Sequence, residues 1–292
     1  MKITLMYNYD MEAPTIYRIK RRIYIKNNND RYILLPVKSK KELNELYMIL
    51  KKYKLDNKYY EIVMTKNKEL TIIYAGTEFV LIKITNTNNI SLTEERISTN
   101  LTLPASIYNL DRSNWYFLWS KKNDYIEYKS NHVRKKYKLI DESVDYYLGM
   151  AETAIAYLNN INNYELKQNL TLSHRRIIDD EMKNPLNIII DVKERDISEY
   201  LKYLFINQRY SQERIKGILF GYPDTEISYI RIYARLLYPN YYFDLYENIE
   251  LEKENEEKLK ELIKRIDEYE IYLKDIFNII ISRQKIKKID WI

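Results

Sequence analysis

The spacing of apolar residues changes once along this 292-residue chain, and that change limits its possible folds more than any other feature. In residues 1–90 apolar side chains alternate with polar ones or form short blocks between polar turns, as in β-strands. In residues 91–292 they recur mainly at helical spacing. The sequence therefore predicts an α+β protein with a β-rich first part containing one helix and a mainly helical second part.

The first part is predicted to be a meander of short strands. Two strands are expected within Thr15–Lys26 and a third over Tyr32–Val37. Pro36 lacks a backbone donor, so it should lie at a strand end or at a sheet edge. Further strands are expected at Tyr59–Thr65, Leu70–Tyr74 and Glu78–Thr85.

A helix is predicted directly after the third strand. Ser39 and Glu42 have the spacing of a capping box. The apolar residues that follow at helical spacing are Leu43, Leu46, Tyr47, Leu50 and Tyr53.

In the second part, apolar stripes predict one helix from Val144 to Leu158 and another that begins near Ile197. Glu226–Leu237 is predicted as a helix ended by Pro239, and a long amphipathic helix is expected between Leu259 and Ile276. The stretch Leu170–Asp191 is the least helical.

Composition excludes several classes of site and of protein. The chain has no cysteine and two histidines, which excludes disulfides, a thiol nucleophile and a histidine-rich metal site. With 46% hydrophobic and 31% charged residues, it is expected to fold. Its start lacks the features of a secretion signal and its apolar runs are short, so we expect a cytoplasmic protein without a membrane span.

Four short segments then follow one another in a recognisable order. They are Leu172–Arg176 (LSHRR), Asn184–Asn187 (NPLN), Ile188–Asp191 (IIID) and Arg195–Tyr200 (RDISEY). This order resembles the catalytic loop, metal loop and following helix of the aminoglycoside phosphotransferase and choline kinase superfamily. It is most similar to the degenerate form found in spore coat CotS/YutH-like proteins. The resemblance implies a two-lobed, protein-kinase-like fold.

The resemblance also implies roles for individual residues. His174 would be the loop histidine, and Arg176 stands where the superfamily has an acid that orients the acceptor hydroxyl. A guanidinium stays charged and cannot accept a proton, so this function is predicted to be missing. Asp179 or Asp180 could replace the acid only in a rebuilt loop.

The same resemblance makes Asn187 and Asp191 the ligands of a magnesium ion that would accompany ATP. Each residue also has a simpler interpretation. His174 could be an ordinary hydrogen-bonded loop histidine, and Asn184–Asn187 could be an ordinary turn.

The β-rich part gives little support for a phosphate site. The first glycine is Gly76, so no glycine-rich phosphate loop can join the first two strands. Lys38, paired with Glu42 or Glu45, is the nearest candidate for a lysine that contacts phosphate. A solvated surface lysine is the favoured alternative, because Pro36 disturbs the strand just before it.

Three functions remain open at this stage. The first is a catalytically inactive kinase-like scaffold or binding protein, which the resemblance places in the spore coat or in sporulation with an unknown protein partner. The second is an active ATP-dependent phosphotransferase for a small molecule. The third is a binder of nucleic acid or of an acidic partner through the basic cluster Arg134–Lys138 and nearby tyrosines, although no nucleic-acid motif supports it.

Overall fold

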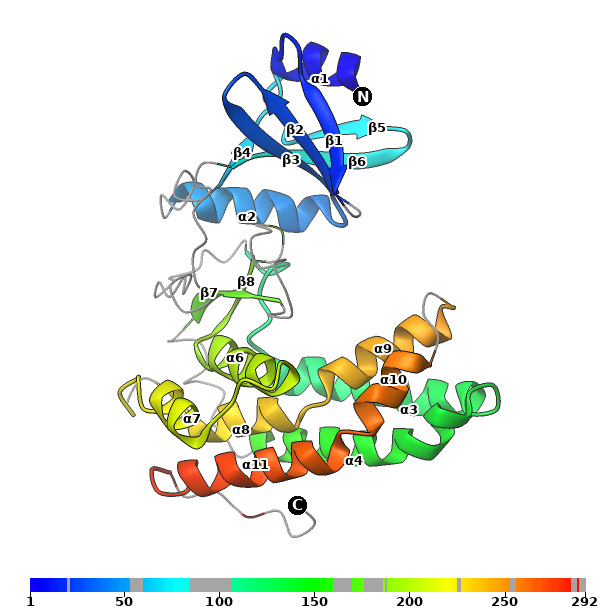
Figure 1. The fold of residues 1–292 in the computed structure, drawn as a ribbon, viewed down its shortest axis with the longest axis vertical. Coiled ribbons are helices and arrows are strands. Elements are labelled where there is room, and N and C mark those ends of the chain that lie inside the picture. The colour runs from blue at the N-terminus through cyan, green and yellow to red at the C-terminus, as the bar shows by residue number, and fades with distance from the viewer. Residues whose placement is uncertain are drawn as a thin grey trace. The chain divides into compact units, whose positions relative to one another are not determined.

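The computed structural model describes residues 1–19, 22–52, 60–84, 107–159, 170–175, 186, 188–224, 227–252, 256–284 and 288. These residues form two units, each described by itself below. The first unit contains residues 1–84 and 107–110 together with 186 and 188, and the second contains the rest. One unit is built on an antiparallel sheet and the other on helices (Figure 1), which confirms the predicted α+β class.

The first unit is a six-stranded sheet in which every pairing is antiparallel. Its order is β1-β2-β3-β6-β4, with β5 paired to β6. Pro36 is the last residue of β3, so the missing donor falls at a strand end as predicted. The strands are β1 (Thr15–Ile19), β2 (Arg22–Asn27), β3 (Asp30–Pro36), β4 (Tyr60–Val63), β5 (Thr71–Tyr74) and β6 (Thr77–Ile84).

Helices lie on both sides of this sheet (Figure 1), namely α1 (Lys2–Tyr9) and α2 (Lys40–Lys52). Leu5 of α1 packs in one core cluster with Leu34 and Leu81, which face each other across β3 and β6. The neighbouring residues of those strands project to the side of α2, so the central strands are apolar on both faces. Helix α1 was not predicted, because Leu5 is its one buried residue and no side chain caps its start.

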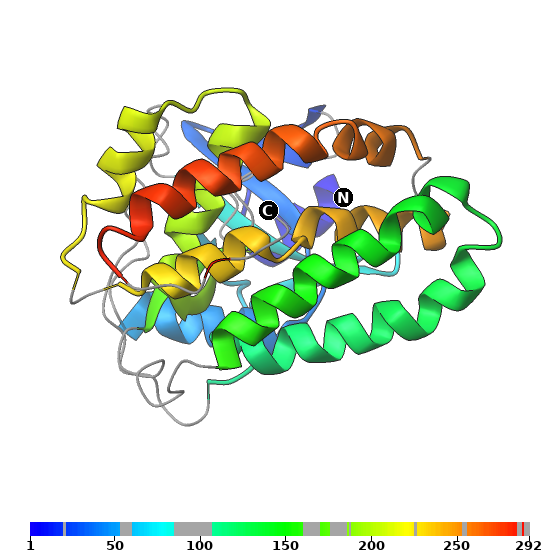
Figure 2. The ribbon, with the colours of Figure 1, turned by 90° about the horizontal axis from the view of Figure 1, so that it is seen from below.

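The second unit is built mainly from helices. Figure 2 shows α3, α4, α8 and α11 as successive rows, and their contacts follow the same order. The helices are α3 (Trp115–Val133), α4 (Lys138–Asn159), α6 (Glu194–Ile206), α7 (Gln212–Leu219), α8 (Tyr229–Leu237), α9 (Asn240–Glu250), α10 (Glu257–Ile263) and α11 (Ile266–Ile280). No helix in the described ranges is both long and apolar enough to cross a bilayer.

The predicted long C-terminal helix is two helices, α10 and α11, which meet at Arg265. The Arg265 guanidinium donates to the backbone oxygens of Phe205 and Ile206 at 3.0 and 3.3 Å. These carbonyls lie in the last turn of α6, where the regular helical hydrogen bonds end. The helical spacing of apolar residues continues from α10 into α11, so the sequence pattern gives no sign of the break between them.

Two short strands outside the large sheet bring the motif region together. They are β7 (Leu170–His174) and β8 (Ile188–Val192), which pair with each other. Every residue of β8 is buried. The backbone N–H of Arg112 donates to the oxygen of Ile190 at 2.8 Å, which fixes the segment that leads into α3 beside β8.

In the first unit, Glu45 of α2 fixes the segment at residues 107–110. Its carboxylate accepts hydrogen bonds from the backbone N–H groups of Tyr108, Asn109 and Leu110, at 3.4, 3.1 and 2.9 Å, and from the Asn109 side chain. Burial alone would raise the pKa of Glu45, but these donors outweigh it and hold the pKa below its ordinary value.

Since its pKa is lowered in the folded state, Glu45 stabilises the protein at neutral pH, and this contribution is lost as the pH falls from 4.5, the ordinary glutamate value, through the lower pKa of the folded protein. Glu45→Gln should lower the free energy of unfolding by about 2 kcal/mol at pH 7. The difference from the wild type should shrink in urea titrations below that pH. Exposed Glu12 is the matched control, and Glu12→Gln should have little effect. A Glu45→Gln difference that is independent of pH would contradict this role.

Candidate functional site

The predicted site residues divide into those the structure describes and those it does not. Arg176, Asp179, Asp180 and Asn187 lie outside the described residues. The backbone of His174 ends β7, and Asp191 lies within β8. Asp191 is therefore the one residue of the predicted catalytic and metal-binding set whose side-chain surroundings are defined.

The Asp191 carboxylate is completely buried and hydrogen-bonded through both oxygens. Oδ1 accepts from the indole Nε1 of Trp115 and from the backbone N–H of Val192, each at 2.8 Å. Oδ2 accepts from Nη1 of Arg195, also at 2.8 Å. The residue has 0% of its surface exposed.

Burial raises the pKa of Asp191 to about 6, although the nearby guanidinium groups of Arg195 and Arg235 act in the opposite direction. The ion pair with Arg195 balances the charge of this carboxylate inside the protein.

Arg195 connects this carboxylate to Arg175, which lies directly after β7 in the predicted catalytic-loop segment Leu172–Arg176. One end of its guanidinium forms the ion pair with Asp191, and Nη2 donates to the backbone oxygen of Arg175 at 2.5 Å. Arg195 is four residues after Asp191 and lies in the first turn of α6, which begins directly after the end of β8. Only 7% of Arg195 is exposed.

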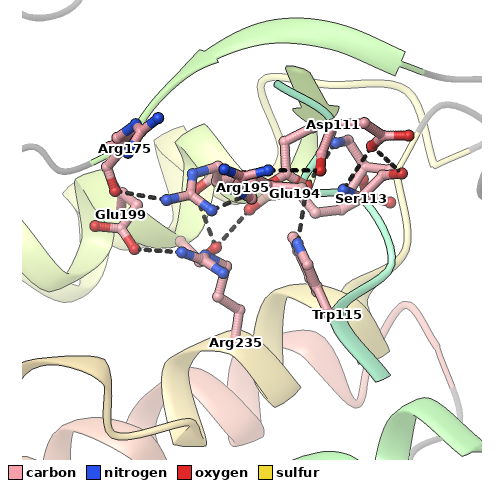
Figure 3. A network of polar contacts seen from close by, with 12 residues as sticks. Asp111, Ser113, Trp115, Arg175, Glu194, Arg195, Glu199 and Arg235 are labelled. Carbon is pink, nitrogen blue, oxygen red and sulfur yellow. Dashed lines mark hydrogen bonds and ion pairs between the residues drawn. The ribbon is translucent and has the colours of Figure 1, made fainter. Parts of the chain in front are cut away.

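A second buried ion pair lies next to the first. Nη2 of Arg235 on α8 donates to Oε1 of Glu199 on α6 at 2.8 Å. The Arg235 guanidinium also lies over the ring of Trp115, 5.0 Å from its centroid. Figure 3 shows Trp115, Arg195, Glu199 and Arg235 converging from α3, α6 and α8. We call these residues, with Asp191, the Asp191 cluster.

Glu194, in the first turn of α6 beside Arg195, binds the start of α8. Its Oε1 accepts from the backbone N–H of Ser228 at 2.8 Å and lies 3.5 Å from Nη1 of Arg231. Burial raises the pKa of Glu194, while Arg231 opposes the change. This carboxylate thus joins α6 to α8.

The predicted phosphate-binding residues of the first unit have different surroundings. Lys38 is exposed, and Glu42 is half-buried, with its backbone N–H bonded to Oγ of Ser39 at 3.3 Å as the capping box predicts. The Glu45 carboxylate is bonded to residues 108–110.

The described part of the site does not fit a magnesium ion. Mg²⁺ needs carboxylate oxygens at about 2.1 Å and usually keeps several waters. The Asp191 oxygens instead bind an indole, a backbone amide and a guanidinium, and none of their surface is open to water. Among the described side chains, no group of three or more histidine, aspartate or glutamate residues could hold a metal.

Sequence reasoning missed Arg195 and Trp115. Arg195 was part of a quoted motif, and its closeness to Asp191 in the sequence is the one signal that could have found it. Trp115 lies 76 residues before Asp191, and nothing in the sequence connects them.

Comparison with known proteins identifies the family. The chain matches the family described as "Spore coat putative kinase YutH" over residues 2–276. It is 25% identical over 305 aligned positions to the endospore coat-associated protein YutH of Bacillus subtilis strain 168, covering 90% of this chain and 89% of that protein.

Solved structures support the fold. The aminoglycoside phosphotransferase from Alicyclobacillus acidocaldarius superposes with a TM-score of 0.57 at 10% identity, over 94% of both chains. Spectinomycin phosphotransferase APH(9)-Ia, solved with ADP and spectinomycin, gives 0.59 at 10% identity, over 95% of this chain and 97% of that one. At such low identity the likeness shows the fold alone, and it confirms the predicted kinase-like class.

The predicted resemblance to CotS/YutH-like proteins is thereby confirmed. Since the family match extends over most of the sequence, the chain belongs to the spore coat YutH family of kinase-like proteins.

Proposed function

We propose that this protein is a kinase-like binding protein of the spore coat that does not transfer phosphoryl groups. The observation that carries the proposal is that protein groups already bind both carboxylate oxygens of Asp191. In the superfamily that the chain resembles, an acid at this position would hold magnesium beside ATP. Here the carboxylate is fully buried and bonded to Trp115 and Arg195.

Two features of the sequence point the same way. Arg176 stands at the position of the acid that would orient the acceptor hydroxyl, and its guanidinium cannot act as a base. No glycine precedes Gly76, so the first two strands lack a loop shaped to approach phosphates closely. Phosphoryl transfer depends on positioning and charge neutralisation, and the metal, base and phosphate-loop contributions are all weakened.

The basic cluster Arg134–Lys138 favours a structural role over binding of nucleic acid. Arg134 is paired with Asp145, Lys136 with Glu252 at 2.5 Å, and Lys138 with Glu142 at 3.4 Å. Lysine and arginine side chains that already have acidic partners are less available to replace the counterions of a phosphate backbone. We therefore propose a protein partner within the coat rather than nucleic acid.

The proposal predicts the outcome of a turnover assay. Purified protein given Mg²⁺, ATP or GTP, and a panel of aminoglycosides and amino alcohols should release no more ADP or GDP than Asp191→Asn. Circular dichroism should show that the variant is folded, and Asp124→Asn, which changes an exposed aspartate on α3, is the matched control. Saturable turnover by the wild type and Asp124→Asn that is lost in folded Asp191→Asn would establish the alternative, an active phosphotransferase.

The location is tested separately. A fluorescent fusion of this chain, produced in sporulating Bacillus subtilis without its own YutH, should collect at the periphery of the developing spore. Extraction of the coat from purified spores should release the fusion. Fluorescence that remains diffuse through the mother cell would contradict the proposed place in the coat.

A further inference from the structure

We propose that Arg195 is the resident cation of the Asp191 carboxylate, so that its guanidinium takes the place of the magnesium ion that the sequence resemblance implies. The inference deepens the proposed function, on which it rests, because it names what fills the metal position. The ion pair joins Nη1 of Arg195 to Oδ2 of Asp191 at 2.8 Å, with the carboxylate at 0% exposure.

The position of Arg195 in its helix supports this assignment. It lies in the first turn of α6, next to Glu194 and Asp196, which are the acidic residues of that turn. The N-terminal end of a helix carries a partial positive charge, so acids are favoured there and a buried arginine is disfavoured. The bonds to Asp191 and to the Arg175 carbonyl offset this cost.

The charge of the site also requires an internal cation. An ionised carboxylate that is removed from water is costly unless it is paired and hydrogen-bonded. Trp115 and Val192 supply neutral donors to Oδ1, and Arg195 supplies the positive charge at Oδ2. Arg235, the other guanidinium of the Asp191 cluster, is itself paired with Glu199.

A divalent ion that binds Oδ2 of Asp191 would have to displace Arg195. That displacement would also release the Arg175 carbonyl, to which the same guanidinium donates. The Arg195 guanidinium therefore has two effects. It neutralises the charge of Asp191, and it anchors the backbone at Arg175, directly before Arg176. Arg195 acts here as a positioning residue through Asp191 and Arg175.

The test removes the charge while keeping a hydrogen-bond donor. Arg195→Gln should lower the melting temperature by roughly 10 °C, because one partner of a buried ion pair is lost. Millimolar MgCl₂ or MnCl₂ should then recover about half of that loss in a saturable way, because a ligand that binds only the folded state stabilises it. The wild type should show no stabilisation beyond that of NaCl at equal ionic strength.

Two variants provide the controls. Arg195→Lys keeps the charge and should not respond to divalent cations. Arg231→Gln removes the guanidinium from another buried carboxylate, Glu194, which the resemblance does not assign to a metal, and it should also fail to respond.

Saturable stabilisation of the wild type by Mg²⁺ would overturn the inference, and this measurement does not depend on whether any variant folds. A destabilised Arg195→Gln that no divalent cation rescues would also overturn it, because Arg195 would then be a packing residue only. Equal rescue of Arg231→Gln would also overturn it, because divalent cations would then stabilise any buried carboxylate that has lost its arginine.

The inference and the proposed function can fail separately. Phosphoryl transfer by a wild type that ignores Mg²⁺ in the melting assay would defeat the proposed function and leave Arg195 as the cation. Absence of turnover together with saturable Mg²⁺ stabilisation of the wild type would defeat the inference alone.

Discussion

The ion pair between Asp191 and Arg195 is the contact around which the helical unit is organised. It joins the end of β8 to the first turn of α6, and through Arg175 it also holds the end of the β7 region. Trp115 brings the start of α3 to the same carboxylate. One buried negative charge thus fixes three segments that are far apart in the sequence. The loss of either partner would leave the other charge buried and unpaired, which is much more costly than the loss of a surface pair.

Guanidinium and magnesium solve the same electrostatic problem with different consequences. A metal ion neutralises an acid but can dissociate from the protein, and it keeps coordination positions open for water or phosphate oxygens. A guanidinium is covalently part of the chain, its five donors are directional, and it stays charged at any physiological pH. A fold stabilised in this way can keep the kinase-like architecture without a metal.

Much of the fold could be predicted from the sequence, because the two apolar periods differ clearly between the two parts of the chain. The strand end at Pro36 and the capping box of Ser39 and Glu42 follow from backbone chemistry that acts over a few residues. Helix α1 escaped prediction because one buried leucine gives no periodic signal. The break before α11 escaped because it depends on Arg265 reaching the end of α6, a contact that local spacing does not encode.

The site was harder to predict for the same reason. Asp191 could be identified by its place after a buried apolar run, and its neighbour in sequence, Arg195, was visible but had no assigned role. Its partners Trp115 and Arg235 come from other helices, and only the packing of the unit brings them together. The resemblance to the kinase superfamily implied a metal ligand, whereas in the structure the carboxylate is paired with the guanidinium of Arg195.

The most direct test of which cation lies at Asp191 is anomalous diffraction from crystals of the purified protein grown with Mn²⁺ and a non-hydrolysable ATP analogue. We expect no manganese peak within coordination distance of the Asp191 carboxylate, and clear density for Arg195 bonded to it. A manganese ion bound to Asp191, with Arg195 turned away, would contradict this expectation.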